Sequence, residues 1–64
     1  MKATEFKVWQ GHVDMSGREV ADAFGKSQDT ISAYRTKGVP KREEAMVRLA
    51  CAAIIAKLPP WYPK

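Results

Sequence analysis

Residues 18–38 restrict the fold of this chain more than any other stretch. Val20, Ala21 and Phe24 have the spacing of one buried helical face. Gly25 follows, where a helix end needs a residue that tolerates a positive φ. We therefore predict a short helix that ends in a tight turn.

A second short helix is predicted over residues 28–36. Ser27 offers a hydroxyl as its N-cap, and Ile31 and Tyr34, three residues apart, form its inward face. Helices this short cannot bury two faces separately, so the pair must share one core and cross steeply. The outer face of the second helix then has no core to contact. Its residues are small or hydrogen-bonding: Gln28, Asp29, Ser32, Ala33 and Thr36.

Val20, Ala21, Gly25 and Ile31 together resemble the signature of the helix-turn-helix in phage repressors and Cro proteins. In that signature the small alanine lets the helices touch, the glycine makes the turn and the β-branched residue fills the core. The resemblance covers nearly the whole chain, from about residue 4 to residue 61.

The resemblance implies an all-α, compact, lambda-repressor-like domain of four or five helices. The helix-turn-helix would span about residues 17–37, and an extended Pro/aromatic tail would follow at residues 59–64. Two residues depart from the pattern. Asp14 stands where a glycine is usual, and Asp29 puts an acid on the face that must approach DNA.

Two further helices are expected around this pair. The first runs from about Glu5 to Val13, is capped by Thr4 and follows frayed residues 1–3. Asp14 ends it, since Asp tolerates the left-handed region. The Ser-x-x-Glu spacing of residues 16–19 forms a capping box for the second helix.

The last helix is expected over residues 41–57, after the Val39-Pro40 link. Its apolar stripe should pack on the first two helices, and its members are Met46 or Val47, Ala50, Cys51, Ile54 and Leu58.

A chain of 64 residues allows one domain, residues 1–64, with a thin core. Cys51 is the only cysteine, so no disulfide can form within a monomer. Because no signal peptide is apparent, we expect the protein to lie in the cytoplasm of a bacterium or phage-infected host, associated with the nucleoid. The longest apolar run, residues 49–56, is too short to cross a membrane.

His12 and Cys51 are single residues of their kinds, so we predict no metal site, no catalytic residue, no cofactor and no small-molecule ligand.

Basic residues gather near the end of the second helix of the pair. The chain has eleven Lys and Arg against seven Asp and Glu, a net charge of +4, and four of the basic residues fall within residues 35–42. Such a cluster beside an exposed polar helix is typical of a phosphate-backbone binder. A solvated loop and helix end is the alternative interpretation.

The predicted DNA contacts divide into base-reading and phosphate-binding residues. A Gln28 amide can pair with adenine N6 and N7, Asp29 can accept from cytosine N4, and Ala33 can touch a thymine methyl. Asp29 also suits a helix N-terminus on dipole grounds alone. The base-reading set is Gln28, Asp29, Ser32 and Ala33, and the phosphate set is Ser16, Gly17, Arg18, Ser27, Arg35, Thr36, Lys37, Lys41 and Arg42.

Trp61 and Tyr62 stand between prolines and need a surface to lie on. They either fold back onto the first helix near Trp9 or cross to a second subunit. A helix-turn-helix monomer covers too few base pairs to select one operator, so we expect a two-fold dimer built on the C-terminal part. Its interface residues would be Ile55, Leu58, Trp61 and Tyr62.

Two functions from different classes follow. The first is a sequence-specific regulator that binds a double-stranded DNA operator as a homodimer and represses by occluding a promoter. Its resemblance places it in a phage, prophage or mobile element. The second is a protein-interaction module, an antitoxin or adaptor, that uses the same fold and the aromatic tail.

Overall fold

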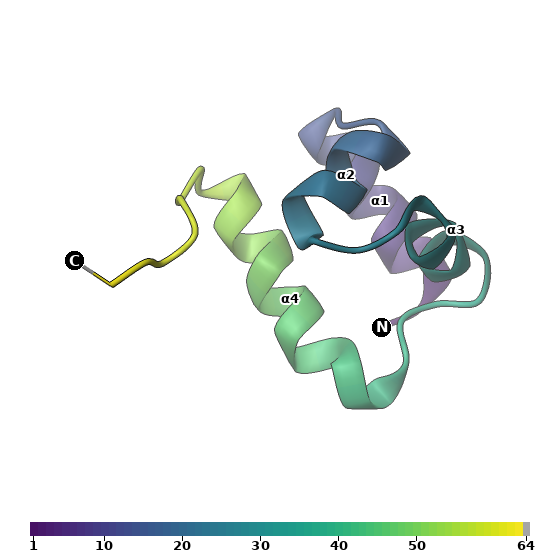
Figure 1. The fold of residues 1–64 in the computed structure, drawn as a ribbon. Coiled ribbons are helices and arrows are strands. Elements are labelled where there is room, and N and C mark those ends of the chain that lie inside the picture. The colour runs from purple at the N-terminus through teal and green to yellow at the C-terminus, as the bar shows by residue number, and fades with distance from the viewer. Residues whose placement is uncertain (64) are drawn as a thin grey trace.

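The computed structural model describes residues 1–63 and holds four α-helices and no strand over that range (Figure 1). They are α1 (Ala3–Val13), α2 (Gly17–Phe24), α3 (Gln28–Thr36) and α4 (Lys41–Ile55). The prediction of an all-α fold with four helices is confirmed, and no fifth helix occurs in the described residues. None of these helices is both long enough and apolar enough to cross a membrane.

The core is centred on Phe6, Val20 and Ile31, which α1, α2 and α3 contribute and which are at most 1% exposed. The Phe6 ring lies 5.4 Å from the Tyr34 ring between centroids, so α1 packs directly on α3. The remaining core residues are Trp9, Ala21, Tyr34, Val39, Val47 and Cys51. The predicted shared core of the two short helices is therefore present, with α1 closing one side and α4 another.

Most of the predicted helix ends are confirmed. Asp14 has φ 54° and ψ 46° and ends α1, and Gly25 has φ 66° and ends α2. Ser16 and Glu19 form the expected capping box, and the Ser27 hydroxyl caps α3 by accepting from the Thr30 N–H. These short polar side chains and one glycine set the boundaries of α2 and α3.

The start of α1 differs from the prediction. The helix begins at Ala3 after Lys2, so Thr4 is not its cap and residues 1–3 are not frayed. The Glu5 carboxylate reaches back and accepts the N–H of the N-cap residue Lys2 at 2.9 Å. The Met1 carbonyl accepts the Val39 N–H at 2.9 Å, and this bond holds the first residue against the link between α3 and α4.

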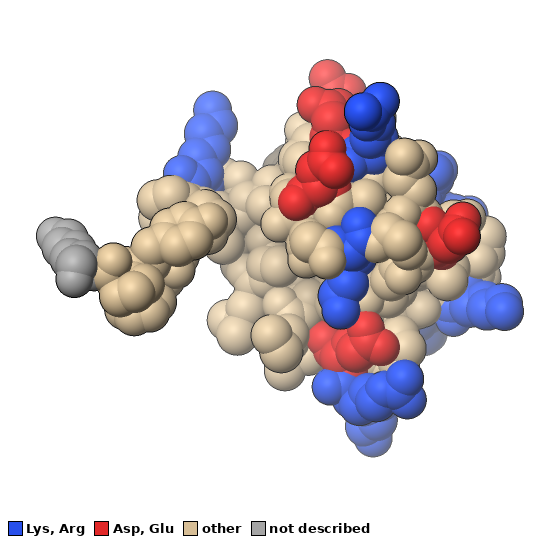
Figure 2. All heavy atoms as spheres, viewed as in Figure 1, with Lys and Arg blue, Asp and Glu red and all other residues tan. Residues whose placement is uncertain are grey.

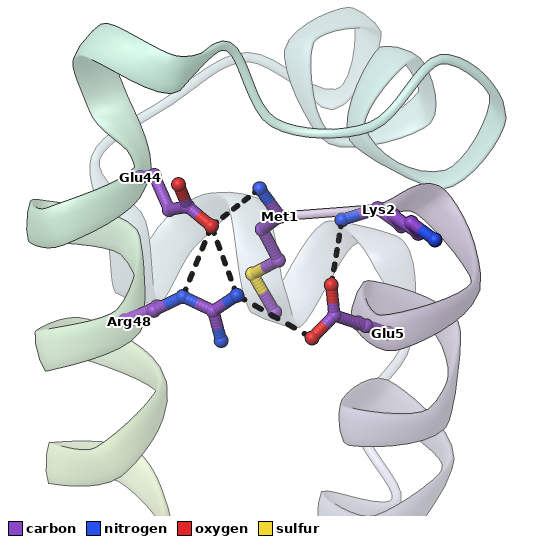
Figure 3. A network of polar contacts seen from close by, with 5 residues as sticks. All are labelled: Met1, Lys2, Glu5, Glu44 and Arg48. Carbon is purple, nitrogen blue, oxygen red and sulfur yellow. Dashed lines mark hydrogen bonds and ion pairs between the residues drawn. The ribbon is translucent and has the colours of Figure 1, made fainter.

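A polar network then ties the N-terminus to α4 (Figure 3). The Met1 ammonium lies 2.7 Å from the Glu44 carboxylate, and Arg48 contacts both Glu44 at 2.9 Å and Glu5 at 3.4 Å. A hydrogen bond from the N-terminal amine and another from Arg48 hold the pKa of Glu44 below its ordinary value. The network joins the beginning of α1 to the first half of α4, segments that are about forty residues apart in sequence.

The end of α4 also differs from the prediction. The helix ends at Ile55, two residues before Lys57, because Lys57 takes a left-handed φ of 58°. The Leu58 N–H then donates to the Ala53 carbonyl at 2.9 Å, a pattern that closes a helix end. Pro59 favours this end, since proline disfavours helical geometry in the residue before it.

The apolar stripe of α4 is partly as predicted. Val47 is 5% exposed and fills the position that either it or Met46 was expected to take, whereas Met46 is 77% exposed. Cys51 is buried and Ile54 packs against the core. Leu58 was expected in this stripe but is 63% exposed, because the chain has left the helix before it.

Gly38 and Gly11 form a matched pair for a stability test. Gly38 has φ 93°, and a Cβ there would lie 2.9 Å from the Met1 carbonyl oxygen, whereas a Cβ at Gly11 in α1 would meet nothing within 4 Å. Gly38→Ala should therefore lower the free energy of unfolding by more than about 1–2 kcal/mol, and Gly11→Ala should raise it by about 0.5–1 kcal/mol. Urea denaturation followed by circular dichroism measures both. A Gly38→Ala protein as stable as the parent would show that Met1 does not lie against Gly38.

Candidate nucleic-acid interface

One face of α3 is buried and the other is at the surface. Ile31 and Tyr34 are 1% and 2% exposed, and they anchor the helix in the core. Gln28, Asp29 and Ser32 are exposed and Ala33 is half-buried. Three of the four residues predicted to read bases therefore lie on the exposed part of α3, and Ala33 lies at its edge.

Two hydroxyls of the predicted phosphate set are engaged within α3. The Ser27 Oγ lies 3.0 Å from the Thr30 Oγ1 and also accepts the Thr30 N–H. The Thr36 hydroxyl donates to the Ser32 carbonyl at 3.0 Å. The Thr36 hydroxyl would have to leave the Ser32 carbonyl to donate to a phosphate oxygen, whereas the Ser27 oxygen serves the helix as an acceptor of the Thr30 N–H.

The first turn of α2 carries both a cationic side chain, Arg18, and a carboxylate, Glu19. Glu19 accepts the Ser16 N–H at 3.0 Å, and this bond lowers the pKa of Glu19 from its ordinary value. The Ser16 N–H is thus occupied, whereas Gly17 and Arg18 stand in the first turn, where helical geometry provides their N–H groups with no acceptor. Arg18 is exposed. Of the three predicted phosphate contacts here, those two keep a donor directed away from the helix.

The basic cluster is defined as Arg35, Lys37, Lys41 and Arg42, and all four side chains are exposed. It runs from the last turn of α3 through the link to the first turn of α4. Only Arg42 has a carboxylate close by among the described residues, Glu43 at 3.9 Å, and Arg42 remains 84% exposed. Over the face drawn in Figure 2, Lys and Arg alternate with Asp and Glu and do not form one continuous positive surface.

Tyr34 connects α3 to the start of α4. Its hydroxyl donates to the Glu43 carboxylate at 2.7 Å. Burial first, and this hydrogen bond second, raise the pKa of Tyr34 to about 12. The sequence assigned Tyr34 only to the core. The bond to Glu43 also spans the α3–α4 link, residues 37–40, which carries Lys37 of the basic cluster.

Sequence reasoning did not include Lys7 in the interface. Lys7 and Arg35 line the same small cavity of about 260 Å³ between α1 and α3. The buried Gln10 side chain reaches this cavity and donates to the Met15 carbonyl at 3.0 Å, which closes the turn after α1. The only sequence signal that could have pointed to Lys7 was its position in the first helix, between the buried residues Phe6 and Gln10.

The predicted dimer residues are also at the surface. Ile55 is 51% exposed, Trp61 84% and Tyr62 74%, so neither aromatic residue packs on Trp9. Lys64, the last residue of the predicted tail, lies outside the described residues. Across residues 1–63 no three His, Cys, Asp or Glu side chains come together in a way that could hold a metal ion.

Removal of the Tyr34 hydroxyl gives a pH-dependent test of the α3–α4 connection. Tyr34→Phe should lower the free energy of unfolding by about 1.5–3 kcal/mol near pH 7. Because the folded pKa is raised, the contribution is complete below the ordinary pKa of 10.0 and is lost as the pH rises toward about 12. The stability difference between parent and variant should therefore shrink between pH 10 and 12, measured by urea denaturation. A constant difference would mean that the hydroxyl does not donate to Glu43.

Comparison with known proteins gives no relative from which a role could be transferred. No family model, no curated protein and no solved structure matches the chain at a significant level. The function is accordingly inferred from the side chains described above.

Proposed function

We propose that this chain is a sequence-specific double-stranded DNA-binding regulator in which α2 and α3 form a helix-turn-helix. The observation that carries the proposal is the exposed face of α3. Gln28, Asp29 and Ser32 offer amide, carboxylate and hydroxyl groups on a helix whose opposite face is anchored in the core. A rigid helix with short polar side chains on its outer face fits the major groove.

The basic cluster supports the same proposal. Its four cations flank the C-terminal end of α3, and Arg18 marks the N-terminal end of α2. Cations at both ends of such a helix pair would meet phosphates and set the orientation on the duplex, while α3 reads the bases. In this arrangement the protein acts as a homodimer on a short pseudo-palindromic operator and represses by occupying a promoter. The resemblance of Val20, Ala21, Gly25 and Ile31 to the phage-repressor signature suggests a phage, prophage or mobile element as its source.

The second candidate is a protein-interaction module. The exposure of Trp61 and Tyr62 favours it, since large aromatic side chains at a surface commonly mark a binding site. The two candidates differ in their dependence on salt. For a DNA-binding protein the logarithm of the affinity for random duplex falls linearly with the logarithm of the salt concentration, with a slope that reflects the number of phosphate contacts. A protein that shows no binding to duplex DNA at low salt would favour the interaction module.

Gln28→Ala tests base reading. On an operator selected from a random pool, the substitution should cost about 1–3 kcal/mol and relax the preference at one base pair. Binding to random duplex should hardly change, because that binding comes from phosphates. Fluorescence anisotropy with both duplexes measures the difference. Equal losses on the two would show that Gln28 contacts no base.

Lys37→Ala tests the positioning role of the basic cluster. It should weaken binding to every duplex and make the salt slope shallower by about one unit per contact. Lys57→Asn is the matched control, since it removes one Lys charge at the far end of α4 and Asn tolerates the positive φ at that position. The control should leave the slope unchanged. If both variants alter the salt slope equally, the effect comes from net charge, and the basic cluster does not contact phosphates in preference to other lysines.

A further inference from the structure

An apolar groove lies between α1 and α4, and the core does not fill it. It encloses about 540 Å³, and its main lining residues are Val8, Trp9, His12, Arg48, Cys51 and Ile55. Val8 is 73% exposed and Ile55 is 51% exposed, although both are large aliphatic side chains. Water contacts this apolar surface in the single chain, which is unfavourable.

The floor of the groove is formed by the buried residues Trp9 and Cys51. The Trp9 indole N–H donates to the Cys51 carbonyl at 3.1 Å and joins α1 to α4 beneath the groove. Burial raises the pKa of the Cys51 thiol to about 11. The groove is therefore a preformed surface with a fixed floor and two exposed apolar walls, which suits an apolar ligand.

The aromatic tail, defined as residues 58–63, has the matching chemistry. It carries no charged side chain, and Trp61 and Tyr62 are 84% and 74% exposed. In Figure 1 the tail leaves the body at the end of α4, and Figure 2 shows uncharged atoms over most of that side of the molecule. Pro59 and Pro60 restrict the backbone, so little conformational entropy remains to be lost when the tail binds.

The geometry at the end of α4 directs the tail away from its own groove. The left-handed Lys57 and the bond from the Leu58 N–H to Ala53 turn the chain toward α2, where the start of the tail lines a cavity with Ala23 and Ile54. The groove lies on the other side of α4, toward α1. To reach it, a tail stiffened by two prolines would have to reverse across the end of its own helix.

We propose that the aromatic tail of one copy occupies the α1–α4 groove of a second copy, and that the second copy's tail reciprocates in an isologous two-fold dimer. This rests on the homodimer of the proposed function and supplies its acceptor surface, but it does not depend on DNA binding. The indole N–H and the phenol hydroxyl would find acceptors at the polar rim, where Thr4, Glu5 and His12 also line the groove.

The buried area is sufficient for a stable dimer. Four aromatic side chains, two from each copy, bury about 150–250 Å² each, and the surfaces that receive them bury a similar amount. The total is about 1,200–2,000 Å², the size of a standard specific interface. Apolar anchors seated in a preformed groove are also the contacts that dominate interface energies.

Site-directed cross-linking tests which copy supplies the tail. In a Cys51→Ala background, one protein carries Val8→Cys in the groove wall and another carries Pro63→Cys beside the aromatic anchors. After mixing and treatment with a short bismaleimide, a covalent heterodimer of the two should form within minutes. Ser32→Cys on α3 replaces Val8→Cys as the matched control and should not cross-link to the tail.

A single chain with both Val8→Cys and Pro63→Cys should give covalent dimers. An intramolecular link as the main product would overturn the proposal, because the tail would then occupy its own groove. Absence of any link, together with a monomeric mass in sedimentation, would equally overturn it and favour a different protein as the occupant.

Complementation tests reciprocity. Trp61→Ala and Val8→Lys change exposed residues, so both proteins should keep the parent's helicity while each weakens self-association about tenfold or more. A mixture should recover part of the association, since it pairs one intact tail with one intact groove. No recovery would contradict tail exchange.

Random-duplex binding is measured on the same proteins. Monomers that bind DNA would refute only the proposed dimer, and dimers that do not bind DNA would refute only the proposed role as a DNA-binding regulator.

Discussion

The fold depends on the packing of Phe6 against aromatic rings from three helices. Its ring lies 5.3 Å from Trp9, 6.2 Å from Phe24 and 5.4 Å from Tyr34 between centroids. A chain of this size has few other large side chains to bury, so a single residue of α1 holds α2 and α3 at their mutual position. Phe6 therefore fixes the position of α3 from the core side, although Phe6 itself is fully buried and does not lie on the exposed face of α3.

The N-terminus has a comparable role for α4. Met1 accepts the Val39 N–H, lies against Gly38 and pairs with Glu44, while Arg48 reaches back to Glu5. The ion pairs are near the surface, and exposed pairs contribute little individually. Together with the Tyr34–Glu43 bond they join α1, α3 and α4 around the α3–α4 link, and the basic cluster lies on that link and on the two helix ends beside it.

The exposed face of α3 differs in chemical character from the α1–α4 groove and the tail. The exposed face of α3 is polar, and the cations cluster around its C-terminal end, whereas the α1–α4 groove and the tail expose large apolar side chains. A monomer gains nothing from that apolar exposure. The proposed dimer would cover the groove and the tail and does not use the exposed face of α3, so one chain could pair with a copy of itself and also bind DNA.

Local chemistry in the sequence was sufficient to predict the four helices and most of their ends. Ser16, Ser27 and Gly25 act within a few residues of themselves, and the spacing of Ile31 and Tyr34 alone separates the buried face of α3 from its surface. Contacts between distant segments were decided only by the tertiary structure. Met1 is held in place because Val39 and Glu44, from distant parts of the sequence, come within reach of it. The groove is of the same kind, since it exists only where α1 and α4 meet and no periodicity within either helix reveals it.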